Sequence, residues 1–307
     1  MSQDRLIWFK GKLRPADEAL VPVLSPTAQF GLNVFEGLRG YWSQDRHNLY
    51  IFRFEDHLDR LFESCRLIGI SSPHSKAEIA DIVNDTLRAN DYRTDVAVRV
   101  TLFVDGEGSW SSSEPVGMFV APIAKSRRAA NQRTGASACI SSWERINDRA
   151  MPPRAKVGAN YINGRYAHLE AKRDGYDLPI LLDRQGKVTE GAGSCLFMVR
   201  KGVLVTPAAT SSVLESITRD AVITLAADEG IPVTVREIDR TELLLAEELF
   251  LCGSAAEITP LTSIDRLPVG SGEVGVVTER LHQRYLQVAS GAEKSFSHWL
   301  APVYPEV

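Results

Sequence analysis

The chain has 307 residues, of which 44% are hydrophobic and 24% are charged. This balance is typical of a folded globular protein with one large domain or two ordinary ones, and it excludes a mostly disordered chain. The formal net charge is 35 − 39 = −4, without a cluster of basic residues. The composition therefore favours neither a nucleic-acid partner nor an anionic membrane surface.

Targeting and redox signals are weak throughout the sequence. The N-terminal residues lack the features of a signal peptide, and no apolar run approaches the roughly 18 residues of a membrane helix. None of the four cysteines is in a CxxC pair, which indicates free and mostly buried thiols rather than disulfides or a zinc site: Cys65, Cys139, Cys195 and Cys252. We therefore expect a cytoplasmic protein without a metal site.

Residues 1–123 are predicted to form a small N-terminal domain. Residues 54–68 have apolar side chains at helical spacing and predict an amphipathic helix. Ser75 and Glu78 form a capping box and predict a second helix that ends near Asn90. The β-branched and apolar runs predict strands over 6–9, 95–104 and 116–123.

Residues 124–134 contain no segment that could be buried at low cost, so they are predicted to be an exposed connector. Residues 135–307 would then form a large C-terminal domain. Its helices are expected over about 160–175, 217–229 and 277–288, and its strands over 137–142, 178–182, 196–199, 233–238 and 249–252. Runs of strands with a few helices, without strict βαβ alternation, predict an α+β fold of two mixed domains.

Two chemically suggestive patterns carry no function. The glycines of 270–275 fit GxGxxG, but only 32 residues follow Gly275, too few for a dinucleotide-binding unit. The six histidines are scattered and form no ligand pair, and His57 and His168 are interpreted as surface or capping groups.

Lys156 is the first candidate for chemistry. It follows a proline-rich turn and precedes Gly158 and a predicted helix start at Asn160. A lysine held on a stiff turn and partly desolvated can form a Schiff base with a carbonyl compound, although this segment alone favours an ordinary surface lysine.

Glu190 is the second candidate, because it lies beside Gly191, Ala192 and Gly193 between two apolar strands. A buried glutamate is costly unless it faces a cation, such as a protonated pyridine nitrogen. An exposed hairpin remains the alternative. Two segments could hold a phosphate through backbone N–H groups: the helix start at 214–219 and the small residues of 253–257.

Six segments occur in an order that resembles a known family. They are VFEGLRGY, FRFEDHLDRL, PPRAKVGANY, DRQGKVTEGAGSCLF, SSVLESITRDA and LFLCGSAAEITPLTSID. The chain resembles class IV (fold-type IV) pyridoxal-phosphate aminotransferases, most closely the branched-chain amino-acid aminotransferases, over roughly residues 5–290. The resemblance implies the two-domain fold of that family and pyridoxal 5′-phosphate as cofactor.

The resemblance also implies a role for each candidate. Lys156 would bind the cofactor covalently and be the catalytic base, Tyr161 would hydrogen-bond its phenolic oxygen, and Glu190 would keep its pyridine nitrogen protonated. Further contacts to the cofactor would come from Arg60, Ser194, Leu214, Ile217, Thr218 and Ser254. Ser254 stands where the family usually has threonine, and it keeps the hydroxyl.

The substrate would contact Phe30, Phe35, Arg39, Ala97, Arg99 and Ala255. Phe30 and Ala97 replace tyrosines of the branched-chain enzymes, whereas Arg99 keeps the position that meets the side-chain carboxylate of glutamate. Cys195 replaces an asparagine, an exchange that the sequence alone does not explain.

We therefore expect an aminotransferase that moves amino groups between L-amino acids, of branched-chain type or glutamate, and 2-keto acids by a ping-pong mechanism. The same resemblance leaves open a D-amino-acid or (R)-amine transaminase, an aminodeoxychorismate lyase or a cofactor-binding protein without turnover. Because the family builds its pocket partly from a neighbouring subunit, it also implies at least a homodimer.

Overall fold

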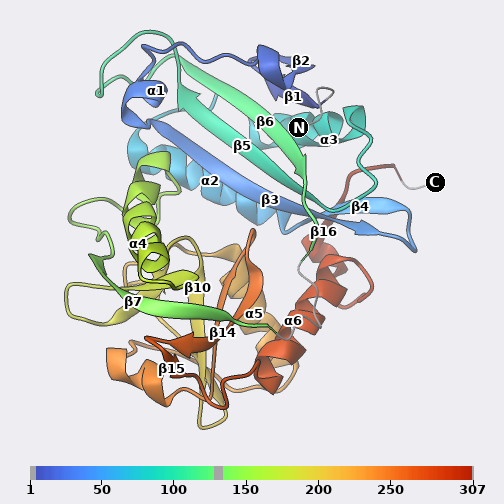
Figure 1. Cartoon of the computed structure of the whole chain (residues 1–307). Helices are drawn as coiled ribbons and strands as arrows, with labels where there is room; N and C mark the ends of the chain where they lie inside the picture. The colour runs from blue at the N-terminus through green and yellow to red at the C-terminus, as the bar shows by residue number, and fades with distance from the viewer. Residues whose placement is uncertain (1–4, 128–133, 306–307) are drawn as a thin grey trace. The chain divides into compact units, whose positions relative to one another are not determined.

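The computed structural model describes residues 5–127 and 134–305, and its internal contacts divide the chain into two compact units (Figure 1). The first unit contains the chain as far as Arg127, Ala155–Ala159 and the chain from Val288 onward. The second contains the described residues 134–154 and Asn160–Gln287.

This division differs from the predicted one. The sequence interpretation assigned all residues after 134 to one domain, whereas residues 155–159 and the C-terminal residues have their contacts in the first unit. Of the predicted connector 124–134, Ala124 ends a strand and residues 128–133 lie outside the described part of the chain.

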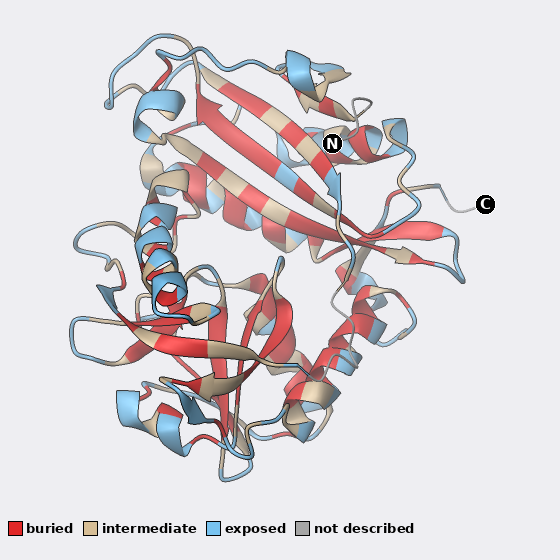
Figure 2. Ribbon diagram, in the orientation of Figure 1, coloured by how far each residue is buried: buried red, intermediate tan, exposed pale blue. Residues whose placement is uncertain are grey.

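The first unit is built on an antiparallel seven-stranded sheet with the strand order β16-β4-β3-β5-β6-β1-β2. Its strands are β1 (Leu6–Phe9), β2 (Lys12–Pro15), β3 (Asn33–Ser43), β4 (Asn48–Phe52), β5 (Val96–Val104), β6 (Val116–Ala124) and β16 (Leu300–Pro302). Buried and half-buried residues alternate along the first half of β3, as period-two geometry requires when one face is covered (Figure 2). The C-terminal strand β16 therefore completes a sheet that starts near the N-terminus.

Three helices accompany this sheet: α1 (Pro26–Phe30), α2 (Phe54–Ile68) and α3 (Lys76–Ala89). Helix α2 begins and ends at the predicted residues, and Ser75 forms the predicted capping box with Glu78 at the start of α3. Apolar side chains of α2, α3 and the sheet form one core, in which Leu58, Leu61 and Val83 are fully buried. Short 3₁₀ turns lie at Ala16–Glu18 and Ser297–Trp299.

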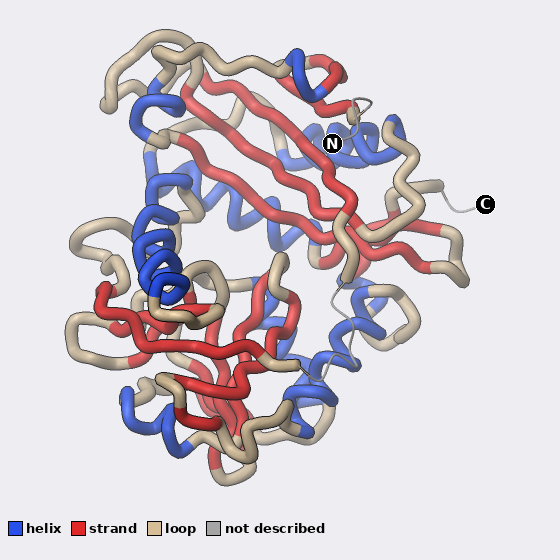
Figure 3. The backbone as a smooth tube through the Cα atoms, viewed as in Figure 1, coloured by secondary structure: helices blue, strands red, loops and turns tan. Residues whose placement is uncertain are grey.

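The second unit contains a mixed nine-stranded sheet (Figure 3). Its strands are β7 (Ala136–Glu144), β8 (Leu178–Leu182), β9 (Val188–Gly191), β10 (Cys195–Arg200), β11 (Val203–Thr206), β12 (Val233–Val235), β13 (Glu248–Gly253), β14 (Glu257–Ile264) and β15 (Leu267–Pro268). Strand β9 pairs with both β8 and β10, so the strands β10-β13-β14-β7-β8-β9 close into a ring. The ring encloses an apolar core that includes Ile180, Val188 and Leu196.

The second unit also carries α4 (Tyr161–Arg173), α5 (Ile217–Asp228), the greater part of α6 (Val276–Ala289) and a 3₁₀ turn at Arg240–Leu245. A further 3₁₀ turn, Gly158–Asn160, begins in the first unit and ends at the first residue of the second unit's next segment. Over the described ranges, no helix is both long and apolar enough to cross a membrane. The two mixed units confirm the predicted α+β class.

Candidate active site

The segment that carries Lys156 is held by hydrogen bonds on both sides. The Phe35 N–H donates to the Lys156 carbonyl (3.0 Å), and the Lys156 N–H donates to the Ser64 hydroxyl of α2 (3.0 Å). Val157 forms a β-bridge with Val34, so the segment lies along the edge of β3. The Lys156 amine is 5.2 Å from the centre of the Phe35 ring. The structure thus places this lysine on a fixed stretch of backbone with an aromatic face beside its amine.

A cluster of charged side chains lies on the same side of α2. His57, Arg60 and Ser64 share one helix face, because they occupy positions i, i+3 and i+7. The Glu36 carboxylate of β3 accepts from Arg60 at Nε (2.7 Å) and Nη2 (2.9 Å), and lies 2.7 Å from His57 Nδ1. Glu36, His57 and Arg60 are 0%, 1% and 8% exposed. Arg60 therefore lies on the same face of α2 as Ser64, which binds the Lys156 backbone. The sequence interpretation did not describe this helix face.

The protonation of this cluster follows from its charges. Burial opposes ionisation of Glu36, but Arg60 and His57 outweigh it and hold the Glu36 pKa well below its usual range. An ionised carboxylate can only accept hydrogen bonds, so Nδ1 of His57 carries the hydrogen. Burial lowers the pKa of His57 more than the Glu36 charge raises it. The pair is thus satisfied with a neutral imidazole.

The interpretation of His57 as a surface or capping group is wrong, since its side chain is buried against Glu36. The error has a physical reason. The interpretation followed the polar character of histidine and not its position on the helix. His57 directly precedes the inward-facing Leu58, so the helical pattern places it at the border of the buried face.

Four of the predicted substrate residues lie at alternate positions of β3 and β5. In this register Gly37 pairs with Arg99 and Arg39 pairs with Ala97. Because paired and alternate residues share a face of a sheet, Phe35, Arg39, Ala97 and Arg99 lie on one face. The exposed Arg99 guanidinium is 4.2 Å from the centre of the Phe35 ring.

Two substrate candidates of this unit, Phe30 and Arg39, differ in exposure. Phe30 ends α1 and is 44% exposed. Arg39 is buried, and its guanidinium donates to the backbone carbonyl groups of Lys125 (2.7 Å) and Val96 (3.4 Å). Arg39 thus fastens the end of β6 to β3.

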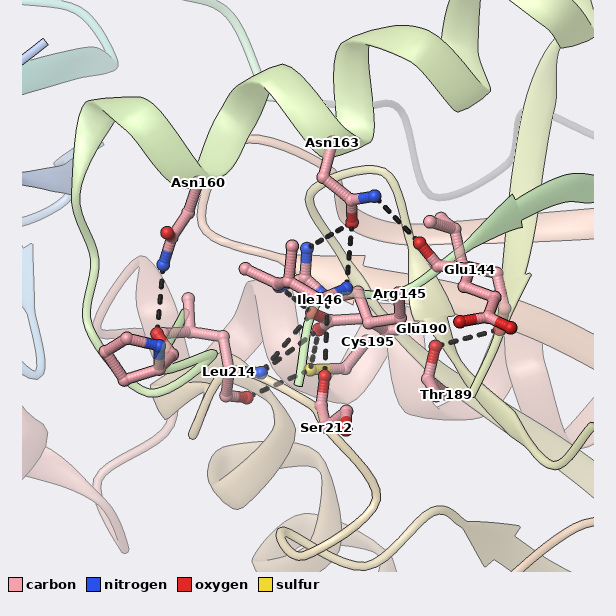
Figure 4. Close-up of polar contacts among 12 residues, drawn as sticks. Glu144, Arg145, Ile146, Asn160, Asn163, Thr189, Glu190, Cys195, Ser212 and Leu214 are labelled. Carbon is pink, nitrogen blue, oxygen red and sulfur yellow. Dashed lines mark hydrogen bonds and ion pairs between the residues drawn. The ribbon is translucent and has the colours of Figure 1, made fainter. Parts of the chain in front are cut away.

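In the second unit, Glu190 is a buried carboxylate on β9 with an arginine as its partner (Figure 4). Arg145 Nη2 is 2.7 Å from Glu190 Oε1, and the Leu214 N–H donates to the same carboxylate (3.3 Å). Arg145 also contacts Asn163 of α4 (3.3 Å) and the Ser212 carbonyl (3.3 Å). Glu190 is therefore not in an exposed hairpin, and a protein cation already balances part of its charge.

Cys195, which the sequence left unexplained, contacts the same carboxylate. Its Sγ is 3.6 Å from Glu190 Oε2 and 3.6 Å from the Leu214 carbonyl. Burial, together with the Glu190 charge, raises the pKa of the thiol to about 12. The protonated thiol therefore acts as a weak donor to Glu190.

Two hairpin turns bring further candidates together. Residues 192–194 connect β9 with β10, and residues 254–256 connect β13 with β14. Cys195 pairs with Cys252, so both turns lie at the same end of the sheet. A Cβ at Gly253 would be 3.6 Å from the Gly193 carbonyl, and one at Gly193 would be 3.6 Å from the Tyr161 ring. Ser194, Ser254, Ala255 and Tyr161 therefore lie around one end of the ring of strands.

Ile217 and Thr218 begin α5 and are buried. Ser216 precedes them, and its hydroxyl accepts the Arg219 N–H (3.2 Å). The first N–H groups of a helix lack partners within the helix and favour an anion. Since the cap occupies the third N–H, those of Ile217 and Thr218 are the ones that a phosphate would use.

Sequence reasoning missed Arg145, Glu36 and His57. For Arg145 there was an indirect signal: if Glu190 is buried, it needs a positive charge nearby, and an arginine or lysine of the chain can supply that charge. No local pattern distinguishes Arg145 from other arginines at strand ends, so the choice among them needed the fold.

Comparison with known proteins agrees with this geometry. The sequence signature of the family described as "Amino-transferase class IV" matches residues 33–264. The branched-chain-amino-acid aminotransferase of Escherichia coli is 37% identical over 304 residues, covering 97% of each chain.

Two crystal structures are also similar to the whole chain. The branched-chain amino acid aminotransferase of Thermobaculum terrenum in its PLP form is 42% identical, with a TM-score of 0.93 and coverage of 98% of this chain and 99% of that one. The branched-chain amino acid aminotransferase of Thermoproteus uzoniensis with norvaline is 37% identical, with a TM-score of 0.91 and coverage of 97% of this chain and 99% of that one. The chain therefore belongs to the class IV aminotransferases.

Proposed function

We propose that this protein is a pyridoxal-phosphate-dependent aminotransferase that moves the amino group of L-amino acids, of branched-chain type and glutamate, to 2-keto acids. The observation that carries the proposal is Lys156, whose backbone is hydrogen bonded to β3 and α2 while its amine lies over the Phe35 ring. The relatives' names, and the norvaline in the Thermoproteus uzoniensis structure, support an amino acid with an apolar side chain as substrate.

The donor groups in each unit fit the chemistry of the cofactor. In the first unit, Lys156 is bound to Ser64 through its backbone N–H, and Arg60 lies one turn before Ser64 on α2. The amine of this lysine and the guanidinium of this arginine suit an aldehyde and a phosphate. In the second, a buried carboxylate, a tyrosine hydroxyl and the start of a long helix suit a pyridinium, a phenolate and a phosphate. Arg145 does not exhaust Glu190, because a carboxylate has about four acceptor positions.

Each residue would then have a defined task. When bound, pyridoxal phosphate supplies the electron sink for the carbanion formed at Cα. Lys156 would bind its aldehyde and later move the Cα proton as general base. Glu190 would accept the pyridine N–H, and Tyr161 would donate to the phenolic oxygen. The cofactor, with its phosphate, would be held by Arg60, Ser194, Leu214, Ile217, Thr218 and Ser254.

The substrate is proposed to meet the face of β3 and β5 that carries Phe35 and Arg99. Arg99 would bind the distal carboxylate of glutamate, and Phe35 would contact the apolar part of the substrate. Phe30 and Ala97 lack the hydroxyl groups found in the branched-chain relatives, and we propose that this favours apolar side chains. The Ala255 N–H would donate to the α-carboxylate of the substrate. Arg39 would support this face of the sheet through its hydrogen bond to the Lys125 carbonyl.

The test is a screen of amino donors with the cofactor-loaded enzyme. L-leucine, L-isoleucine, L-valine and L-glutamate are supplied with a 2-keto acid, and the new keto acid is measured by chromatography. We expect turnover with these L-amino acids and none with D-alanine or an (R)-amine. Turnover of only the D- or (R)-donors, or release of pyruvate from aminodeoxychorismate, would contradict the proposal.

We also propose that the enzyme acts in the cytoplasm as a homodimer or higher homo-oligomer. Exposed apolar side chains in the segment 20–30 support the assembly, since Leu20, Val23 and Leu24 are 74%, 81% and 53% exposed in the single chain. Light scattering after size-exclusion chromatography measures the assembly, and a monomeric mass at micromolar concentration would contradict it.

A further inference from the structure

Glu36 and His57 form a buried support for Arg60 that the proposed function does not use. The Arg60 guanidinium meets Glu36 through two nitrogens, at 2.7 and 2.9 Å. A bidentate pair fixes the plane of a guanidinium, which a single hydrogen bond does not. His57 in turn fixes the carboxylate, because its Nδ1 lies 2.7 Å from Glu36 Oε2.

Burial makes this support specific. The side chains of Glu36 and His57 are 0% and 2% exposed, and that of Arg60 is 10% exposed. Glu36 thus holds the Nε and Nη2 edge of the Arg60 guanidinium in a nearly buried position. A carboxylate behind an arginine also sets the direction of the donors that remain.

The cluster is adjacent to the Lys156 backbone within the first unit. Ser64, one turn after Arg60 on α2, accepts the Lys156 N–H (3.0 Å), and Glu36 directly follows Phe35, whose N–H donates to the Lys156 carbonyl. The same strand and the same helix face therefore fix both the lysine and the arginine.

We infer that Glu36 and His57 are positioning residues, which hold the Arg60 guanidinium in the orientation that receives the phosphate of the cofactor. This inference rests on the proposed function, since it takes Arg60 as a phosphate ligand. Arg60 is the cofactor-binding residue, and Glu36 and His57 act through it.

The experiment compares two ligands that differ only in the phosphate. The full-length protein, freed of cofactor, is titrated with pyridoxal 5′-phosphate and with pyridoxal, and binding is followed by absorbance and fluorescence quenching. In Glu36→Gln, we expect the affinity for pyridoxal phosphate to fall by about ten- to hundredfold, the range for one charged hydrogen bond. The affinity for pyridoxal should stay within about threefold, because it has no phosphate to meet Arg60.

His57→Phe is the second variant, which keeps the ring shape but removes the donor to Glu36. It should show the same selective loss, at about three- to tenfold. It decides the question if Glu36→Gln does not fold. Asp95→Asn is the matched control: Asp95 forms a two-point ion pair with Arg127 in the same unit (2.6 and 2.7 Å), away from the Lys156 segment. It should leave the ratio of the two affinities unchanged.

Equal losses for both ligands in Glu36→Gln and His57→Phe, or no loss in either, would overturn the inference, because a merely structural role cannot sense the phosphate. Wild-type protein that binds neither ligand would instead overturn the proposed function. Arg60→Ala separates the two cases, since it should abolish the preference for the phosphorylated ligand even where the positioning residues do not matter.

Discussion

Glu190 and Glu36 are buried carboxylates, and each has an arginine as its partner at 2.7 Å. Such pairs contribute little net stability, but the loss of one partner leaves an uncompensated charge in a low-dielectric environment. For Glu190 the pairing also has a chemical consequence. Arg145 and the Leu214 N–H hold the carboxylate in one place, so the acceptor that we propose for the pyridine N–H is already positioned by the protein.

The Arg145–Glu190 pair should behave as a coupled unit. Arg145→Met should lower the free energy of unfolding by about 3–5 kcal/mol, because it leaves the buried Glu190 carboxylate without its arginine partner. Adding Glu190→Gln to this variant should restore part of that loss, although Glu190→Gln alone should abolish most of the turnover. Urea unfolding of the four proteins measures the coupling. Strictly additive changes would show that the two side chains do not interact.

Lys156→Ala should abolish amino transfer and the visible absorption of lysine-bound cofactor, because no other described residue holds an amine on this backbone segment. Circular dichroism should show an unchanged fold. Lys172→Ala, an exposed lysine on α4, is the control and should retain full activity. Transamination at the wild-type rate in Lys156→Ala would refute the assignment of this lysine.

Arg99→Ala should separate the donors. If Arg99 meets a distal carboxylate, kcat/KM for glutamate should fall tens- to thousands-fold, while kcat/KM for leucine changes little. The loss corresponds to the roughly 2–5 kcal/mol that truncating one partner of a charged pair costs. Phe30→Tyr and Ala97→Tyr should move the preference toward glutamate. The measurement is the ratio of kcat/KM for the two donors. Equal losses for both would mean that Arg99 binds the α-carboxylate or supports the fold.

At the scale of elements, the predictable parts have local causes. Helix α2 follows from its apolar spacing and α3 from the capping box at Ser75, both written in a few neighbouring residues. Strand β9 and the long strand β3 were not predicted, because glycines and charged residues interrupt their apolar patterns. In both, the interruption is part of the site: Glu36 lies on β3 and Glu190 on β9.

The candidate site could be predicted residue by residue but not as an arrangement. Lys156, Glu190 and the start of α5 have local signals, such as a proline-rich turn, small neighbours and a helix cap. The partners Arg145 and His57 come from elements distant in sequence, and only the sheet pairing brings them to their carboxylates. Long-range pairing has no short sequence signature.

Gly164 of α4 tests how tightly this helix packs on the turn after Glu190. A Cβ at this position would approach the Ala192 carbonyl oxygen to 2.2 Å, and that oxygen cannot rotate away because it belongs to the backbone. Gly164→Ala should therefore destabilise the protein by about 1–3 kcal/mol, although the same exchange stabilises an exposed helix by about 1 kcal/mol. Urea unfolding measures the sign, and a gain in stability would contradict the packing.

Arg165→Ala, on the exposed side of the same helix, is the matched control and should change the stability by less than about 0.5 kcal/mol. In Gly164→Ala the affinity for pyridoxal phosphate should also fall, because the turn 192–194 has to move. An unchanged affinity together with lost stability would separate the packing of α4 from the geometry of the turn.

At the scale of the whole molecule, both units contain acids that should make stability fall in acid. In the first unit, burial opposes the ionisation of Glu36, but Arg60 and His57 outweigh burial and keep the Glu36 pKa low. In the second, hydrogen bonds from Arg236 lower the Glu242 pKa from 4.5 to about 2. Burial also keeps the His57 pKa below 6.5. All three values are depressed, so their contributions are present at high pH and are lost as the pH falls.

The free energy of unfolding should therefore be nearly constant between pH 6.5 and pH 8 and decrease below pH 6.5, first through His57 and below about 4.5 through the two carboxylates. Urea titrations between pH 8 and pH 3 measure this. Glu242→Gln should flatten the decrease below 4.5, at a cost at neutral pH of the order of 1 kcal/mol after allowance for solvent screening. Stability that rises on acidification from pH 7 to pH 4 would contradict these assignments.

The pairing of β16 with β4 has a consequence for synthesis. Leu300 pairs with Phe52, the Val303 N–H donates to the Leu49 carbonyl, and Arg88 of α3 donates to the Val303 carbonyl. A ribosome that has released every residue we propose to touch the cofactor still retains the strand that closes the first sheet. Until β16 has emerged from the ribosome, the nascent chain presents β4 with one unpaired edge, which is the kind of surface that chaperones protect and that neighbouring chains can capture.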